Sequence, residues 1–162
     1  MSSLVGFKVL GEPAPQGSKT AYVRGGAAVL VEGTSKAGRD KHALWRAAVS
    51  EAALVARGGS QFSGPVTVHI EFFMPAPASD PHRTLHAKKP DIDKLARSVL
   101  DSLKVSGLIR DDSLVHSLHA TKFYARDGHW VGAYIAVTDS TEAEKVLREE
   151  SKKNLRNRAK GA

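Results

Sequence analysis

A predicted helix with two aspartates at its start and two more beyond its end constrains this sequence more than any other feature. Asp91 and Asp93 stand at the start, and Asp111-Asp112 fall in the turn that follows. With Asp101, within the helix, five of the nine aspartates lie between residues 88 and 112. The apolar residues of the helix recur at the spacing of one helical face, at positions 92, 95, 96, 99, 100 and 103.

Pro90 decides how the first two aspartates can be arranged. Residues two apart within a helix lie about 200° apart around its axis, so Asp91 and Asp93 could not converge there on one ion. Pro90 fits a boundary just before the helix, which places Asp91 at the N-cap and Asp93 in the first turn. For Asp111-Asp112 to meet this pair, the chain must fold back, and the next strand could do this by pairing beside the strand from Val66.

Clustered carboxylates repel one another and repel a phosphate, so their presence favours a bound hard cation. Mg²⁺ or Mn²⁺ suits oxygen ligands, and Mg²⁺ is often held by one or two carboxylates together with substrate phosphate. The spacing does not match the Ca²⁺ loop of an EF-hand. An ordinary alternative stays open, in which Asp91 caps the helix, Asp93 and Asp101 pair with Arg97, and Asp111-Asp112 forms a turn.

The charge of the chain favours a polyanionic partner. The 162 residues carry a formal net charge of +7, with a pI near 9.8, and the release of counterions from phosphates drives the binding of basic proteins to nucleic acid. The absence of cysteine excludes disulfides, thiolate zinc sites and cysteine nucleophiles. No apolar run is long enough to span a membrane. We therefore expect a cytoplasmic protein that has no membrane partner.

The remaining segments predict strands, hairpins and two further helices. The loop at residues 11–20 carries Lys19, and it either presents this cation to a phosphate or simply connects two strands. Thr141 and Glu144 have the spacing of a capping box, which opens a last helix with a basic end. Strands are expected at residues 5–9, 66–72, 114–125 and 131–137, a hairpin turn at Gly25-Gly26, and a long helix with Trp45 in the core at about 36–57.

Three runs of this chain resemble the core of a known nuclease family. They are K-P-D-I-D-K-L-A-R-S-V-L-D-S-L-K at 89–104, G-L-I-R-D-D-S-L-V at 107–115 and K-F-Y at 122–124. With the loop P-A-P-Q-G-S-K at 13–19, they are similar to the RusA family of Holliday-junction resolvases, small metal-dependent endonucleases common in phages and prophages.

The resemblance implies a role for each acidic residue. It makes Asp91, Asp93 and Asp112 the catalytic acids that bind the metal, with Asp111 and Asp101 in support. Since the ligands are all oxygen atoms, the predicted cofactor is Mg²⁺, with Mn²⁺ as a substitute.

The chain departs from the family pattern at two positions. The family usually has a catalytic lysine four residues after the second aspartate, where this chain has Arg97. Arginine cannot be deprotonated in a protein, so Arg97 could orient Asp93 or hold a phosphate but could not shuttle a proton. Lys94 stands where the family often has asparagine, and it could contact DNA or only solvate the helix start.

The resemblance also implies an α+β fold, with about three helices on a small mixed sheet, and a homodimer. A two-fold dimer presents two identical sites to a four-way junction, whose resolution requires two symmetrical nicks. We expect a nuclease domain over residues 1–140 and a basic C-terminal helix or tail over residues 141–162.

The predicted function is Mg²⁺-dependent resolution of Holliday junctions in recombination, repair or phage DNA processing. One alternative is a nuclease of flaps or replication forks, and another is a non-catalytic protein that binds branched DNA. In addition to a catalytic role for Arg97, contacts with the DNA backbone are expected from Lys19, Lys88, Lys89, Lys94, Lys152, Lys153 and Arg156.

Overall fold

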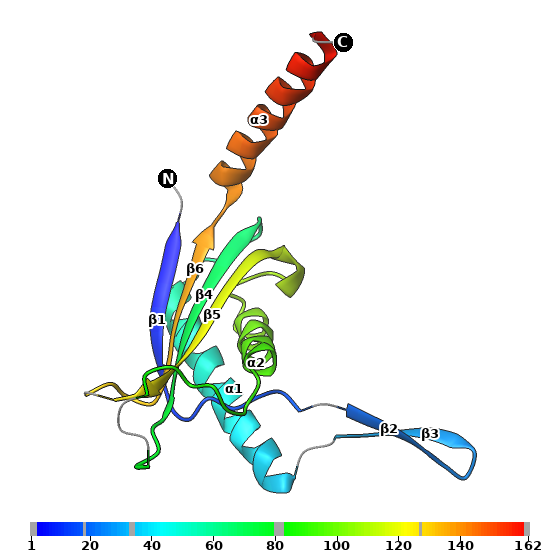
Figure 1. The fold of residues 1–162 in the computed structure, drawn as a ribbon, viewed down its shortest axis with the longest axis vertical. Helices are drawn as coiled ribbons and strands as arrows, with labels where there is room; N and C mark the ends of the chain where they lie inside the picture. The colour runs from blue at the N-terminus through cyan, green and yellow to red at the C-terminus, as the bar shows by residue number, and fades with distance from the viewer. Residues whose placement is uncertain (1–2, 18, 33–34, 80–82, 127, 161–162) are drawn as a thin grey trace.

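The computed structural model describes residues 3–17, 19–32, 35–79, 83–126 and 128–160, and it describes only the backbone of 19–22, 29–32 and 152–160. The described residues form three α-helices, a four-stranded sheet and a separate two-stranded hairpin (Figure 1). The elements are β1 (Leu4–Leu10), β2 (Lys19–Arg24), β3 (Ala27–Glu32), α1 (Lys36–Arg57), β4 (Val66–Pro75), α2 (Ile92–Val105), the 3₁₀ turn η1 (Asp112–Leu114), β5 (Val115–Ala125), β6 (Gly132–Asp139) and α3 (Thr141–Lys160).

The four-stranded sheet has the order β1-β6-β4-β5 and is mixed. β6 pairs antiparallel with both β1 and β4, whereas β5 pairs parallel with β4. A parallel pair requires a crossover connection, which α2 supplies between the two strands. The expected α+β fold is therefore confirmed.

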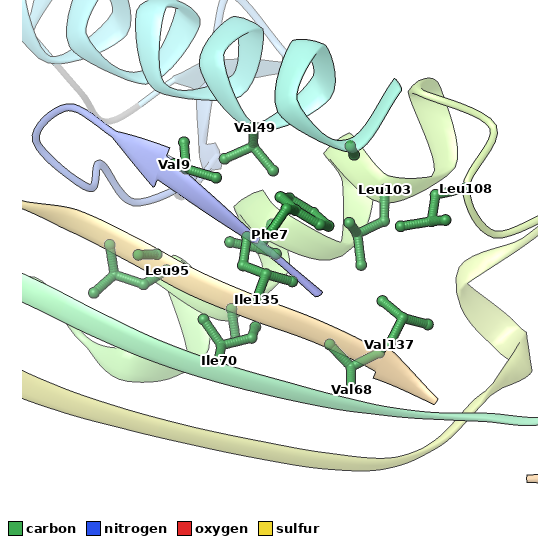
Figure 2. Packing of buried hydrophobic residues seen from close by; sticks show 14 of the residues in the cluster. Phe7, Val9, Val49, Val68, Ile70, Leu95, Leu103, Leu108, Ile135 and Val137 are labelled. Atoms are coloured by element: carbon green, nitrogen blue, oxygen red, sulfur yellow. The ribbon is translucent and has the colours of Figure 1, made fainter. Parts of the chain in front are cut away.

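The core lies between α1, α2 and one face of the sheet. Alternate residues of the strands point into it, and Trp45, expected in the core, is only 2% exposed. Figure 2 shows strand and helix side chains meeting in this layer, among them Phe7, Val49, Ile70, Leu95, Leu103, Ile135 and Val137. This packing fixes the face that α2 turns inward, so its charged residues point away from the core.

α2 and β5 run in opposite directions. Lys122, near the end of β5, donates hydrogen bonds to backbone oxygens just before α2. Asp111, just before β5, pairs with Lys104 in the last turn of α2. The start of α2 therefore lies at the carboxyl end of β5, and the end of α2 lies where β5 begins.

Two elements extend from this body (Figure 1). The β2–β3 hairpin turns at Gly25 and Gly26, with φ of 60° and 79°, as expected for a turn that needs positive φ. The helix α3 leaves the end of β6 and continues to Lys160. None of the described helices is long and apolar enough to cross a membrane.

Candidate functional site

Asp91 and Asp93 form an open acidic pair at the start of α2. Asp91 is the N-cap, as expected, with φ −69° and ψ 140°, but its side chain makes no capping hydrogen bond. Its Oδ2 lies 3.2 Å from Lys94 Nζ, and the side chain is 50% exposed. Asp93 lies in the first turn and pairs with no side chain in the described parts of the chain. Both carboxylates are thus accessible to a ligand from solvent.

Lys122 holds the backbone that precedes this pair. Its Nζ donates to the backbone oxygens of Lys88, at 2.8 Å, and Pro90, at 2.7 Å. The Lys89-Pro90 bond is cis. No role for Lys122 was predicted from the sequence. A usable signal was present, because Lys122 alternates along β5 with Ala120 and Tyr124, so its side chain points toward the helices.

A cleft of about 400 Å³ opens beside Asp91. The loop before β2 forms its other wall, and Gln16 N donates to Lys94 O at 3.1 Å, which ties this loop to α2. Three lysines line the cleft, and one of them, Lys41, pairs with Glu12 at 3.2 Å. The cleft is lined by Glu12, Pro13, Ala14, Pro15, Gly38, Lys41, Lys89, Pro90, Asp91 and Lys94.

The second acidic pair is already neutralised in part by a lysine. Lys104 Nζ lies 2.6 Å from Asp111 Oδ2 and 3.7 Å from Asp112 Oδ1. Asp111 Oδ1 also accepts a hydrogen bond from Ser113 N at 3.0 Å. The hydrogen bond from Lys104 lowers the pKa of the Asp111 carboxyl well below its usual range, and the same contact raises the pKa of Lys104.

The two acidic pairs do not meet within one chain. The expectation that Asp111-Asp112 folds back to join Asp91 and Asp93 is therefore wrong for a single chain. β5 does pair beside β4, but because the pairing is parallel it begins at the far end of α2. A helix of 14 residues spans about 20 Å, which separates Asp91 from Asp111-Asp112 by roughly that length. Among the described residues, no three His, Asp or Glu side chains are grouped to hold a metal ion.

Arg97 lies one turn after Asp93 on the exposed side of α2. The ion pairs considered for it, with Asp93 and Asp101, are not formed in the described structure. Arg97 is exposed, and its guanidinium is available to an external phosphate.

The structure gathers some of the expected DNA contacts and leaves others undescribed. Lys89 and Lys94 line the cleft, and Lys88 is exposed two residues before Pro90. The side chains that lie outside the described structure are those of Lys19, Lys152, Lys153 and Arg156.

Comparisons with known proteins identify the family. The family described as Endodeoxyribonuclease RusA matches residues 11–138, which include both acidic pairs and the cleft. No curated protein matches the chain. One solved structure, 2C-methyl-D-erythritol 2,4-cyclodiphosphate synthase from Plasmodium vivax, shares 12% identity over 85% of this chain and 91% of that chain, but its TM-score of 0.28 supports no argument. The chain belongs to the RusA family of endodeoxyribonucleases.

Proposed function

We propose that this member of the RusA family resolves four-way DNA junctions by Mg²⁺-dependent hydrolysis of two phosphodiester bonds. The observation that carries the proposal is the open pair Asp91 and Asp93 beside a cleft lined by three lysines. The lysines suit the phosphates of a DNA strand, and the carboxylates suit a hard cation.

The residues at the start of α2 fit a magnesium ion. Asp91 and Asp93 offer exposed carboxylate oxygens, and Mg²⁺ commonly takes one or two carboxylates with phosphate and water. When bound there, Mg²⁺ would lower the pKa of a water and stabilise charge on the phosphate. Lys94, which pairs with Asp91 in this structure, would then turn to the DNA backbone.

The remaining residues near this pair bind and position the DNA. Lys41 and Lys89 neutralise phosphates along the cleft, and Arg97 holds a phosphate through its planar guanidinium. Lys122 fixes the segment before Asp91 through its two hydrogen bonds and therefore positions the carboxylate. Lys122 is a positioning residue because its contacts are with the backbone of the chain.

Asp111 and Asp112 would enter the same reaction through a second chain. A two-fold axis perpendicular to a helix reverses its direction, so two α2 helices side by side would place the second acidic pair of one chain near the first pair of its partner. The separation of about 20 Å between the pairs within one chain supports this arrangement. A homodimer of this kind has two composite sites, one for each nick.

The test is cleavage of a synthetic four-way junction with and without Mg²⁺. Asp93→Asn and Asp112→Asn should each reduce cleavage by at least about 100-fold, because each removes a proposed metal ligand. Binding of the junction in EDTA should persist, since each change removes a negative charge near phosphate. Glu51→Gln, at an exposed position of α1, is the matched control. Unchanged cleavage in both aspartate variants would refute the assignment.

Mixing two inactive variants tests the composite site. A heterodimer of Asp91→Asn and Asp112→Asn chains retains one intact site if the pairs combine between chains, and it should nick one strand. If each site were built within one chain, the mixture would remain inactive.

A panel of substrates separates the alternatives. A resolvase should produce paired symmetrical nicks and ligatable products in four-way junctions, whereas a flap or fork nuclease should prefer those branches. A non-catalytic binding protein would show steep salt dependence of binding and no cleavage stimulated by Mg²⁺ or Mn²⁺.

A further inference from the structure

No described helix covers the outer face of the sheet, on the side away from α1 and α2 (Figure 1). An aromatic cluster lies on this face. Phe73 of β4 and Phe123 of β5 are register partners, and their ring centroids are 5.7 Å apart with 23° between the planes. The ring of His129 is stacked on Phe73 at 5.1 Å and 7°, and Trp130 is tilted against Phe73 at 5.2 Å. These rings belong to a surface and not to the core between the sheet and helices α1 and α2.

Polar and charged groups surround these rings. Lys8 Nζ lies 4.3 Å from the centre of the Trp130 ring. Arg126 Nε donates a hydrogen bond to Arg83 O at 2.9 Å, and its guanidinium lies 5.3 Å from the ring of Tyr124, which is on the face of β5 opposite to Phe123. Glu71 is exposed, and its carboxylate makes no hydrogen bond or ion pair within the described residues. A hollow of about 350 Å³ is lined by Glu71, Phe73, Thr84, Phe123, Tyr124, Arg126 and His129.

The combination of groups in this hollow suits an unpaired nucleobase. Flat rings stack on any base, and cations beside them attract its phosphate. A carboxylate such as Glu71 can accept a hydrogen bond from an exocyclic amine. A purely apolar ligand would leave the Glu71 carboxylate without a partner.

A short segment connects the hollow to the first acidic pair. Tyr124 N donates to Thr84 O at 2.8 Å, and His86 N donates to Lys122 O at 3.0 Å, so the segment from Thr84 runs beside the end of β5. It then reaches Asp91 after seven residues, a distance of at most about 25 Å when extended. A DNA strand that advances about 3.4 Å per nucleotide covers this distance in roughly seven nucleotides.

We propose that the hollow formed by Phe73, Phe123 and His129 binds one unpaired base of the junction strand that is cleaved at the acidic site. This inference rests on the proposed function, because it assigns that site a substrate feature. Stacking of the base on the aromatic rings would fix the position of the strand relative to Asp91. The hollow would thereby favour branch points at which a base can leave the DNA double helix.

The test measures binding in EDTA, so it does not depend on cleavage. The probe is a four-way junction with one unpaired 2-aminopurine at the branch point, compared with the fully paired junction. The wild-type protein should bind the probe about ten-fold more tightly and quench its fluorescence by stacking. His129→Ala removes an exposed ring, and Phe123→Leu keeps apolar volume without a ring. Both should lose the quenching and the preference, while affinity for the fully paired junction stays within about two-fold.

Tyr134→Leu is the matched control, because Tyr134 is an exposed ring on the same face of the sheet but does not line the hollow. It should keep the preference and the quenching. Two outcomes would overturn the proposal: no preference in the wild-type protein, or a preference that survives in both pocket variants. Thermal melting confirms that the variants fold. A protein that fails to cleave junctions but shows this preference would refute the proposed function and leave the base site intact.

Discussion

The two ends of α2 carry the same residue types in opposite electrostatic settings. At the start, Asp91 is half exposed and makes no capping bond, and it forms an ion pair with Lys94 on the same helix. Beyond the end, Asp111 is held by both Lys104 and Ser113 N. The first pair is therefore available to a ligand, whereas the second is occupied by the chain itself. Identical acids thus differ in availability because of their neighbours.

The largest expected difference is in cleavage rate, between a variant that removes a carboxylate charge before α2 and one that removes a carboxylate charge after it. Asp91→Asn should reduce cleavage of a four-way junction by at least about 100-fold, because it removes a proposed metal ligand. Asp111→Asn should cost about ten-fold or less, since Asp111 is an assistant whose charge is already paired with Lys104. Single-turnover rates in Mg²⁺ give both values. Equal losses in Asp91→Asn and Asp111→Asn would contradict the difference in availability between these two carboxylates.

Loss of the lysine that positions Asp91 should have the next largest effect. Lys122→Met removes both hydrogen bonds to the backbone before Asp91, so the carboxylate should be displaced and kcat should fall about ten-fold. KM should change little, since the lysines of the cleft remain. Lys145→Met, which changes an exposed lysine of α3, is the control. A change confined to KM would show that Lys122 contacts DNA instead.

A smaller effect is expected at Arg97. Arg97→Ala should weaken junction binding several-fold and reduce the slope of log affinity against log salt by about one, as for the loss of a single phosphate contact. Arg97→Lys should restore the slope but not the full cleavage rate, because lysine lacks the planar fork of arginine. An unchanged slope in Arg97→Ala would place this residue away from the DNA.

The smallest effect concerns the dependence of stability on pH at the second pair. The pKa of Asp111 is lowered by Lys104, so the stabilisation is present above the ordinary aspartate pKa of about 3.9 and is lost as the pH falls through the lower, folded-state value. Lys104→Met should therefore slightly lower the melting temperature at pH 7 and make no difference in strong acid. NMR titration should show the Asp111 pKa returning toward its usual value.

Much of the local structure could be predicted from the sequence. The apolar spacing from Ile92 identified α2, and Pro90 indicated the boundary that makes Asp91 the N-cap. Trp45 was correctly expected in the core, and Gly25-Gly26 marked a real hairpin turn. These features depend on neighbours within a few residues, where periodicity and backbone preferences act directly.

The contacts of the site were less predictable. The absence of an ion pair between Arg97 and Asp101 follows from side-chain orientation, which sequence spacing only permits. The contact of Lys122 with Pro90 joins residues 32 positions apart, and no local pattern specifies it. The aromatic cluster joins β4 and β5 with residues that precede β6, so it too depends on strand pairing.

The sequence by itself determined that a helix separates two pairs of aspartates in a basic chain. Only the tertiary structure decided that these pairs lie about 20 Å apart, because the parallel pairing of β5 with β4 starts the strand at the far end of α2. Hydrophobic alternation records which face of a strand is buried but not the direction in which the strand runs. That direction follows from the packing of α2 across the sheet, which forms only when distant segments meet.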